Sequence, residues 1–201
     1  MYVVDFDGIA PYDASGPPLL GPLVTKQLNT QILLAEPTNY LKLNDPPPHL
    51  GYQVRPPSMF DNDPIRVRQA VYDQDAWAAI IINANATALL REAVATGNTS
   101  YDPLGAAQII YVQARDETTV NNYIVPVLDT LQIEISSMFG KMWAQMVLQN
   151  ASDPTILANI QKAPQALAPA IGFSVYNLRP FTPAVATPAV TIGLICECPS
   201  L

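Results

Sequence analysis

The amino-acid sequence predicts an α/β fold, with a mixed, largely parallel sheet, flanking helices and a long protruding helical arm. Apolar runs rich in β-branched residues at 2–6, 77–82 and 107–114 are typical of strands covered on both faces. Segments whose apolar residues recur at helical spacing alternate with these runs. Such alternation along the chain indicates strands and helices packed in layers around one sheet.

The elements can be placed from these patterns and from the prolines and glycines between them. The proline-rich stretch 37–64 excludes a central strand over most of its length. Asn85 is a plausible N-cap for the helix that follows the second long strand, and Gly97 a plausible end of that helix. In chain order, we expect a strand at 2–6, a helix at 19–28, a short edge strand at 52–54, a helix from 64, a strand at 77–82, a helix after Asn85, a strand at 107–114, the long helix, a helix from 154 and a strand at 172–176.

A long helical segment follows the third predicted strand. Its apolar residues step by three or four positions, close to the α-helical period, and Thr118 or Thr119 can cap its start. Pro126 should kink it or mark its true beginning. A helix of ~30 residues is roughly 45 Å long, so we expect an arm at about 118–163 that contacts a partner or a second copy. The predicted contact residues are Leu131, Ile135, Met138, Met142 and Met146.

Composition limits the classes of partner. The net charge is −7, and the four lysines and six arginines are scattered, which argues against nucleic acid and against anionic lipid headgroups. Charged residues make up 13% of the chain, about half of the roughly 25% usual for soluble domains. A chain with few charges commonly hides surface against other chains or membrane segments. No stretch reaches the ~20 apolar residues of a membrane span, so the chain alone is expected to be soluble.

One motif resembles catalytic machinery. Asp5-Phe6-Asp7-Gly8 matches the start of the Asp-x-Asp-Gly-Thr signature of haloacid-dehalogenase-like phosphatases, in which the first Asp is the nucleophile and the second the general acid/base. Ile9 stands where the signature has Thr, and the late half of the chain lacks the Lys and paired acids that Mg²⁺-dependent phosphoryl transfer uses. We therefore interpret Asp5 and Asp7 as caps of the turn after the first strand, with a Mg²⁺-dependent phosphatase as the alternative.

The remaining candidate residues favour no other chemistry. The single histidine, His49, lies in a proline-rich loop, and Cys196 and Cys198 cannot supply the four ligands of a zinc site. We predict no catalytic residue, metal or cofactor. Three Asn-x-Ser/Thr sequons, at Asn85, Asn98 and Asn150, fall at predicted element boundaries and are candidate glycosylation sites.

Four segments, at 3–8, 76–87, 97–103 and 118–126, together resemble one protein family by their order and spacing. The sequence resembles the fungal nitrosoguanidine-resistance membrane protein family, which is similar to the bacterial phage-infection-protein and ABC-2-type permease group. The resemblance covers about residues 2–192, which we expect to form one extracytoplasmic domain followed by an atypical tail at 193–201.

The resemblance implies a topology and a general role. Members have one membrane span before such a domain and several after it, and the domain lies on the extracellular or luminal side. The family is linked to drug resistance and to transport or lipid organisation, and no catalytic residue can be transferred to this sequence. The expected partners are membrane-spanning segments missing from this chain, a second copy of the domain and an unknown small molecule or lipid. Both ends depart from the family pattern: no span precedes Tyr2, and Cys196 and Cys198 follow the point where another would begin.

Overall fold

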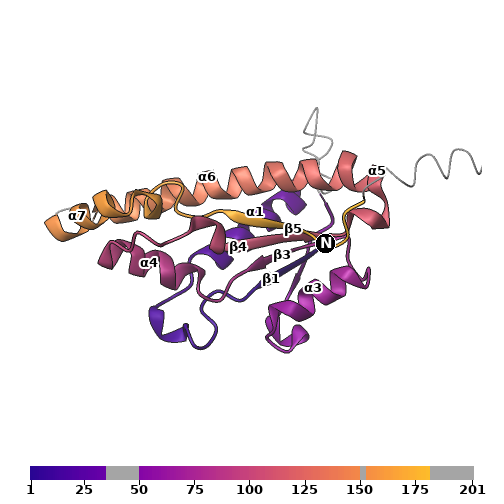
Figure 1. Cartoon of the computed structure of the whole chain (residues 1–201), viewed down its shortest axis with the longest axis horizontal. Helices are drawn as coiled ribbons and strands as arrows, with labels where there is room; N and C mark the ends of the chain where they lie inside the picture. Colours follow the sequence, from indigo (N-terminus) through magenta and orange to yellow (C-terminus); the bar gives the residue numbers. More distant parts are fainter. Residues whose placement is uncertain (35–49, 150–152, 182–201) are drawn as a thin grey trace, which may run out of the picture.

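The computed structural model describes residues 1–34, 50–149 and 153–181. Within these residues five strands form one sheet, in the order β2-β1-β3-β4-β5 (Figure 1). β1 runs parallel to β2 and β3, while β4 runs antiparallel to β3 and parallel to β5. The predicted α/β fold with a mixed, mostly parallel sheet is confirmed. The strands are β1 Tyr2–Asp5, β2 Gln53–Arg55, β3 Ala78–Ile82, β4 Ala107–Tyr111 and β5 Phe173–Asn177.

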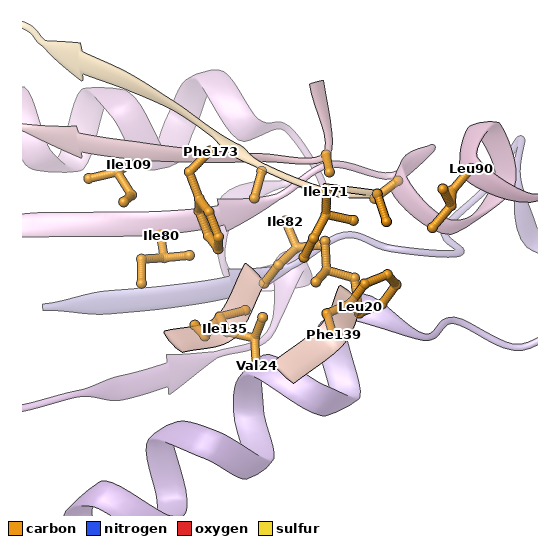
Figure 2. Close-up of a cluster of buried hydrophobic side chains, with 14 of the residues drawn as sticks. Leu20, Val24, Ile80, Ile82, Leu90, Ile109, Ile135, Phe139, Ile171 and Phe173 are labelled. Carbon is orange, nitrogen blue, oxygen red and sulfur yellow. The ribbon is translucent and has the colours of Figure 1, made fainter. Parts of the chain in front are cut away.

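Helices cover both faces of the sheet (Figure 1). The larger core joins alternate strand residues to helices on one face, and α3 covers the other face with a smaller core. Figure 2 shows the larger core, where Ile80 and Ile82 of β3 lie close to Val24, Ile135 and Phe139. The helices are α1 Leu20–Leu34, α3 Pro64–Tyr72, α4 Ala86–Thr96, α5 Glu117–Thr119, α6 Val125–Gln149 and α7 Pro154–Lys162.

The alternation of side chains along β3 accounts for the two cores. Ile80 and Ile82 belong to the larger core, whereas Ile81 belongs to the smaller one, because successive side chains of a strand point to opposite faces. All five residues of β3 are buried, as expected for the central strand. Fully burying each such isoleucine contributes about 1.5–3 kcal/mol relative to leaving it exposed.

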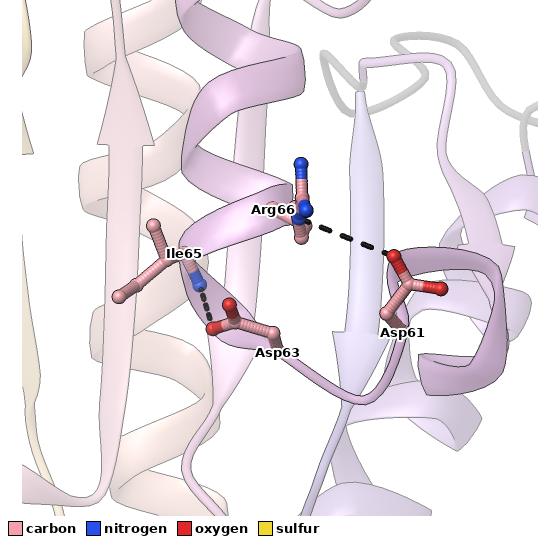
Figure 3. Close-up of polar contacts among 4 residues, drawn as sticks. All are labelled: Asp61, Asp63, Ile65 and Arg66. Carbon is pink, nitrogen blue, oxygen red and sulfur yellow. Dashed lines mark hydrogen bonds and ion pairs between the residues drawn. The ribbon is translucent and has the colours of Figure 1, made fainter.

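The side chain of Asp63 caps the start of α3 (Figure 3). Asp63 accepts a hydrogen bond from the Ile65 N–H at 2.8 Å, and Pro64 occupies the first helical position. The Asp61 carboxylate lies 4.0 Å from the Arg66 guanidinium, but both side chains are exposed, so this ion pair contributes at most about 1 kcal/mol. The cap rather than the ion pair fixes where α3 begins.

The predicted long helix is confirmed, and it packs along the sheet (Figure 1). Leu131 and Ile135 are completely buried in the larger core, so these two predicted contact residues belong to the domain's own interior. Met142 also packs against this core, while Met138 and Met146 are 37% and 38% exposed. The inner face of α6 is therefore occupied by the domain's own core, and Met138 and Met146 lie at the surface of the helix.

Pro126 marks the beginning of α6, which starts at Val125, and this is one of the two outcomes predicted for it. A π-helical turn at Val120–Ile124 joins α5 to α6, and the Val125 N–H donates to the Val120 carbonyl five residues back. Proline has no N–H for the regular ladder and crowds the preceding turn. A π turn accommodates both effects without ending the helix.

Two predicted helix caps are wrong in detail. Asn85 occupies the N-cap position of α4, but its side chain makes no capping hydrogen bond. Asp116, rather than Thr118 or Thr119, caps α5 by accepting from the Thr119 N–H at 3.0 Å. Gly97 ends α4 as predicted, with a left-handed φ of 71°. The Asn85 side chain does not cap α4 because the carboxylate of Asp7 accepts the Thr87 N–H in its place.

Candidate functional site

The carboxyl ends of β1 and β3 form the topological switch point of the sheet, which is the usual ligand site of open α/β sheets. From β1 the chain crosses outward to β2, and from β3 it crosses in the opposite direction to β4. In open α/β sheets, ligands bind in the crevice where connections diverge in this way. Asp5 ends β1 and Asp7 follows it, so the predicted carboxylate pair lies at this switch point.

Asp7 is buried and connects the starts of two helices. Its carboxylate accepts hydrogen bonds from the Thr87 N–H at 3.0 Å, the Thr87 hydroxyl at 2.6 Å and the Leu20 N–H at 3.2 Å. The Thr87 hydroxyl in turn accepts from the Leu19 N–H at 2.9 Å. Leu20 begins α1 and Thr87 lies in the first turn of α4. A carboxylate at two helix N-termini satisfies their free N–H groups and interacts favourably with both helix dipoles.

Asp5 occupies a tighter position beside the first turn of α1. Its carboxylate accepts the Asp7 N–H at 2.9 Å and lies so close to Gly21 that a Cβ there would overlap it. Burial raises the pKa of Asp5 to about 6, although the hydrogen bond from the Asp7 N–H opposes this increase and the charge of Asp7 adds to it. Glycine at position 21 therefore permits the close approach of β1 and α1.

These contacts supply structural roles for both carboxylates. A phosphatase nucleophile and its acid/base partner must direct oxygens towards the substrate. Here both oxygens of Asp7 accept hydrogen bonds from helix starts, and one oxygen of Asp5 caps the turn. Within the described residues, no group of three or more His, Cys, Asp or Glu side chains could hold a metal ion.

A second candidate site is an apolar pocket between α4, α6 and α7, with a volume of about 420 Å³. This lies within the range of about 300–1,000 Å³ typical of small-molecule sites. Val94 from α4, Trp143 and Val147 from α6, and Ile156 from α7 supply much of its wall. No local sequence pattern indicates this pocket, because it forms where three helices separated along the chain converge.

The polar groups around this pocket have partners within the chain. Asn159 donates to the Ala95 carbonyl at 2.6 Å, and the Trp143 indole N–H donates to the Ala166 carbonyl at 2.8 Å. Arg91 donates to two carbonyl groups of the β1–α1 connection, those of Ser15 and Pro17. The pocket therefore offers its occupant mainly apolar contact area. Arg91 at its rim is hydrogen-bonded to the β1–α1 connection, which also contains Asp7.

The three sequons differ in their surroundings. Asn98 is exposed in the loop after α4, and its side chain accepts the Ser100 N–H at 3.0 Å. Asn85 is partly buried, and Thr87 of the same sequon is engaged by Asp7. Asn150, His49, the predicted tail at 193–201 and both cysteines lie outside the described residues. Asn98 thus presents the most accessible sequon in the described part of the chain.

The fold and these two sites define a class: a layered α/β domain with a structural carboxylate at its switch point and an apolar pocket between helices. The chain belongs to the family described as "Protein of unknown function (DUF3533)", which matches residues 1–198. It is also similar to the uncharacterized endoplasmic reticulum membrane protein YJR015W of Saccharomyces cerevisiae, with 25% identity over 154 residues. That match covers 76% of this chain and 30% of the yeast protein.

The chain spans less than a third of the length of its yeast relative. No solved structure matches it. Among the described helices, none combines the length and the apolar character needed to cross a membrane.

Proposed function

We propose that this chain is a non-catalytic, ligand-binding domain on the luminal or extracellular side of a multi-spanning, permease-like membrane protein. The observation that carries the binding role is the preformed apolar pocket between α4, α6 and α7. The yeast relative is an endoplasmic reticulum membrane protein, which supports the membrane setting. A role in drug resistance, membrane transport or lipid organisation would fit an occupant that is an apolar small molecule or a lipid chain.

The chemistry of the pocket supports an apolar occupant. A buried ligand group that demanded hydrogen bonds would compete with those that Asn159, Trp143 and Arg91 already make. Apolar area removed from water contributes roughly 25 cal/mol per Å², without new polar partners. A preformed pocket also avoids much of the cost of ordering side chains on binding.

Trp143 provides a direct readout of occupancy. Trp77→Phe leaves Trp143 as the single tryptophan of the chain. Titration with a fatty acid that carries a nitroxide on its acyl chain should quench this tryptophan in a saturable manner. Val94→Phe, which fills the pocket, should abolish the quenching, whereas Leu89→Phe on an exposed part of α4 should leave it unchanged. Absence of saturable quenching, or equal quenching in the Val94 variant, would contradict a binding role for this pocket.

The non-catalytic part of the proposal rests on how Asp5 and Asp7 are used. Because their oxygens accept hydrogen bonds from the turn and from two helix starts, no reaction is required to account for them. Hydrolysis of a generic phosphate ester should be undetectable with Mg²⁺ present, in the wild type and in Asp5→Asn alike. Turnover that disappears in Asp5→Asn would replace this proposal with the phosphatase.

A further inference from the structure

The strand pairing places the start of β1 and the end of β5 at the same end of the sheet, where one row of residues forms an edge that crosses the strands. Tyr2 pairs with Ala79, Ala79 with Ile110, and Ile110 with Tyr176, so these four residues form one row across the sheet. Three strand spacings of about 4.8 Å separate β1 from β5 along this row, which is about 14 Å. The described chain therefore enters and leaves the fold on the same side, close together.

Arginine–aromatic pairs occur at this edge. Arg115, which follows β4, holds its guanidinium carbon 3.9 Å from the ring centroid of Trp77, which immediately precedes β3. Arg179, which follows β5, lies 3.6 Å from the ring centroid of Tyr72, the last residue of α3. Each such pair is worth about 0.5–1 kcal/mol at an exposed site. Both aromatic rings retain exposed surface.

Further apolar surface lies beside these pairs. A pocket of about 320 Å³ at the same edge is lined by Trp77, Tyr123 and Ile124, together with residues at the start of β1 and before β2. Tyr123 is 66% exposed and extends from the π turn that joins α5 to α6. Phe181, just past β5, is also exposed. Trp77, Tyr123 and Phe181 therefore leave aromatic surface accessible at this edge.

We propose that this edge lies against the headgroup region of a phospholipid bilayer, with Trp77 and Tyr123 at the depth of the headgroups. Tryptophan and tyrosine concentrate at membrane interfaces because an apolar ring and a polar group suit that boundary. The guanidinium groups of Arg115 and Arg179 lie over the rings of Trp77 and Tyr72, and N–H groups at their edges donate to lipid phosphates. The inference rests on the proposed membrane setting and adds which surface of the domain faces the bilayer.

The charges at the edge select the kind of lipid surface. Asp73, Asp75 and Asp116 are exposed near Arg115 and Arg179, so the edge carries both signs. A purely anionic surface would repel the acidic side chains, whereas a zwitterionic headgroup offers a partner to each sign. The surface that fits is a zwitterionic bilayer such as phosphatidylcholine.

The two tryptophans of the chain make the test internally controlled. Trp77 lies at the proposed edge, whereas Trp143 is buried in α6 against α4 and α7. The full chain with a C-terminal hexahistidine tag is tethered to phosphatidylcholine vesicles that contain a nickel-chelating lipid and acyl-brominated phosphatidylcholine. Trp143→Phe reports Trp77 alone, and Trp77→Phe reports Trp143 alone. Bromine quenches tryptophan only at close approach, so tethering without contact leaves both signals intact.

Both chains also carry Val94→Phe, which fills the pocket beside Trp143, and we expect the vesicles to remove most of the Trp77 emission and to leave the Trp143 emission unchanged. Tyr123→Ser in the Trp77-only chain should restore most of the Trp77 emission while the protein stays tethered. Loss of neither signal, or of both equally, would overturn the proposed orientation. The fatty-acid titration of Trp143 is performed without vesicles, so failure of the edge contact leaves that test of the proposed function intact.

Discussion

Asp7 and Thr87, eighty residues apart in the chain, are joined by two hydrogen bonds, one from the Thr87 N–H at 3.0 Å and one from its hydroxyl at 2.6 Å. The same carboxylate accepts the Leu20 N–H. The side chain of Asp7 therefore fixes the starts of α1 and α4 beside the end of β1.

Asp7→Ala should be strongly destabilising. The substitution leaves two buried N–H groups without acceptors and removes a charge that both helix dipoles favour, so we expect a loss of about 3–5 kcal/mol in the free energy of unfolding. Urea denaturation measures it. The matched control is Asp63→Ala, which removes the exposed cap of α3 and should cost about 1 kcal/mol. Equal losses in the two variants would show that Asp7 acts as an ordinary cap.

Gly21 and Asp5 form a steric pair that a double-mutant cycle can measure. A Cβ at Gly21 overlaps the Asp5 carboxylate, so Gly21→Ala should destabilise the wild type by about 1–3 kcal/mol. In the Asp5→Ala background the overlapping atoms are gone, and the same substitution should be neutral or stabilising, since alanine favours helix over glycine. Gly105→Ala, which meets no neighbouring atom, should behave identically in both backgrounds. Additive effects at positions 5 and 21 would refute the contact.

The raised pKa of Asp5 predicts a specific dependence of stability on pH. The folded pKa is about 6, above the ordinary value of 3.8, so the unfolded chain loses its proton first as the pH rises. Protonated Asp5 therefore stabilises the fold fully below about pH 4, and wild-type stability should fall as the pH rises from about 4 to 7. Asp5→Asn retains an acceptor for the Asp7 N–H without the charge, and should gain about 1–2 kcal/mol at pH 7, allowing for partial solvent screening.

Thermal unfolding of both proteins at pH 4, 5, 6 and 7 measures the effect. The stability of Asp5→Asn relative to the wild type should increase steadily from pH 4 to pH 7. A difference that is constant with pH would mean that the carboxyl of Asp5 does not titrate in this window.

The sheet was predictable because its signals are local. The apolar run at 78–82 has no polar position, which identifies a central strand without reference to the rest of the chain. The sequence motif also located Asp5 and Asp7 correctly at a strand end. Their partners could not be predicted, because Thr87 and Gly21 reach them only after β1, β3 and α1 are packed. A glycine next to Pro22 in the first turn of a helix was the one local indication that another group lies close there.

The long helix shows the same limit. Periodicity correctly predicted a helix with one apolar stripe, but a stripe fits a domain core and a contact between copies equally well. Leu131 and Ile135 prove to be core residues, because the larger face of the sheet needs a helix of this length to cover it. The apolar pocket had no local signal, since Val94, Trp143 and Ile156 belong to three different helices.

The proposed luminal location predicts glycosylation at Asn98. Its sequon is exposed after the end of α4, so an attached glycan would extend into solvent without displacing core side chains. Expression of the chain through a secretory pathway, followed by enzymatic deglycosylation, should give a mobility shift that Asn98→Gln reduces. Asn85→Gln is the matched comparison at a partly buried sequon. A correctly folded secreted chain with no shift would argue against exposure to the glycosylation machinery.

Association through α6 predicts different outcomes for two neighbouring positions. Met138 is 37% exposed, so Met138→Asp should lower the oligomer mass in sedimentation equilibrium without changing the circular dichroism spectrum. Ile135 is completely buried, and Ile135→Asp places an unpaired charge in the core, which should cost more than about 4 kcal/mol and unfold the domain. Ile133→Asp controls for surface polarity alone, because Ile133 is exposed and lies about 140° from Met138 around the helix. A wild-type chain that is monomeric at all concentrations, or an Ile133 variant that matches Met138→Asp, would exclude this stripe as the contact surface.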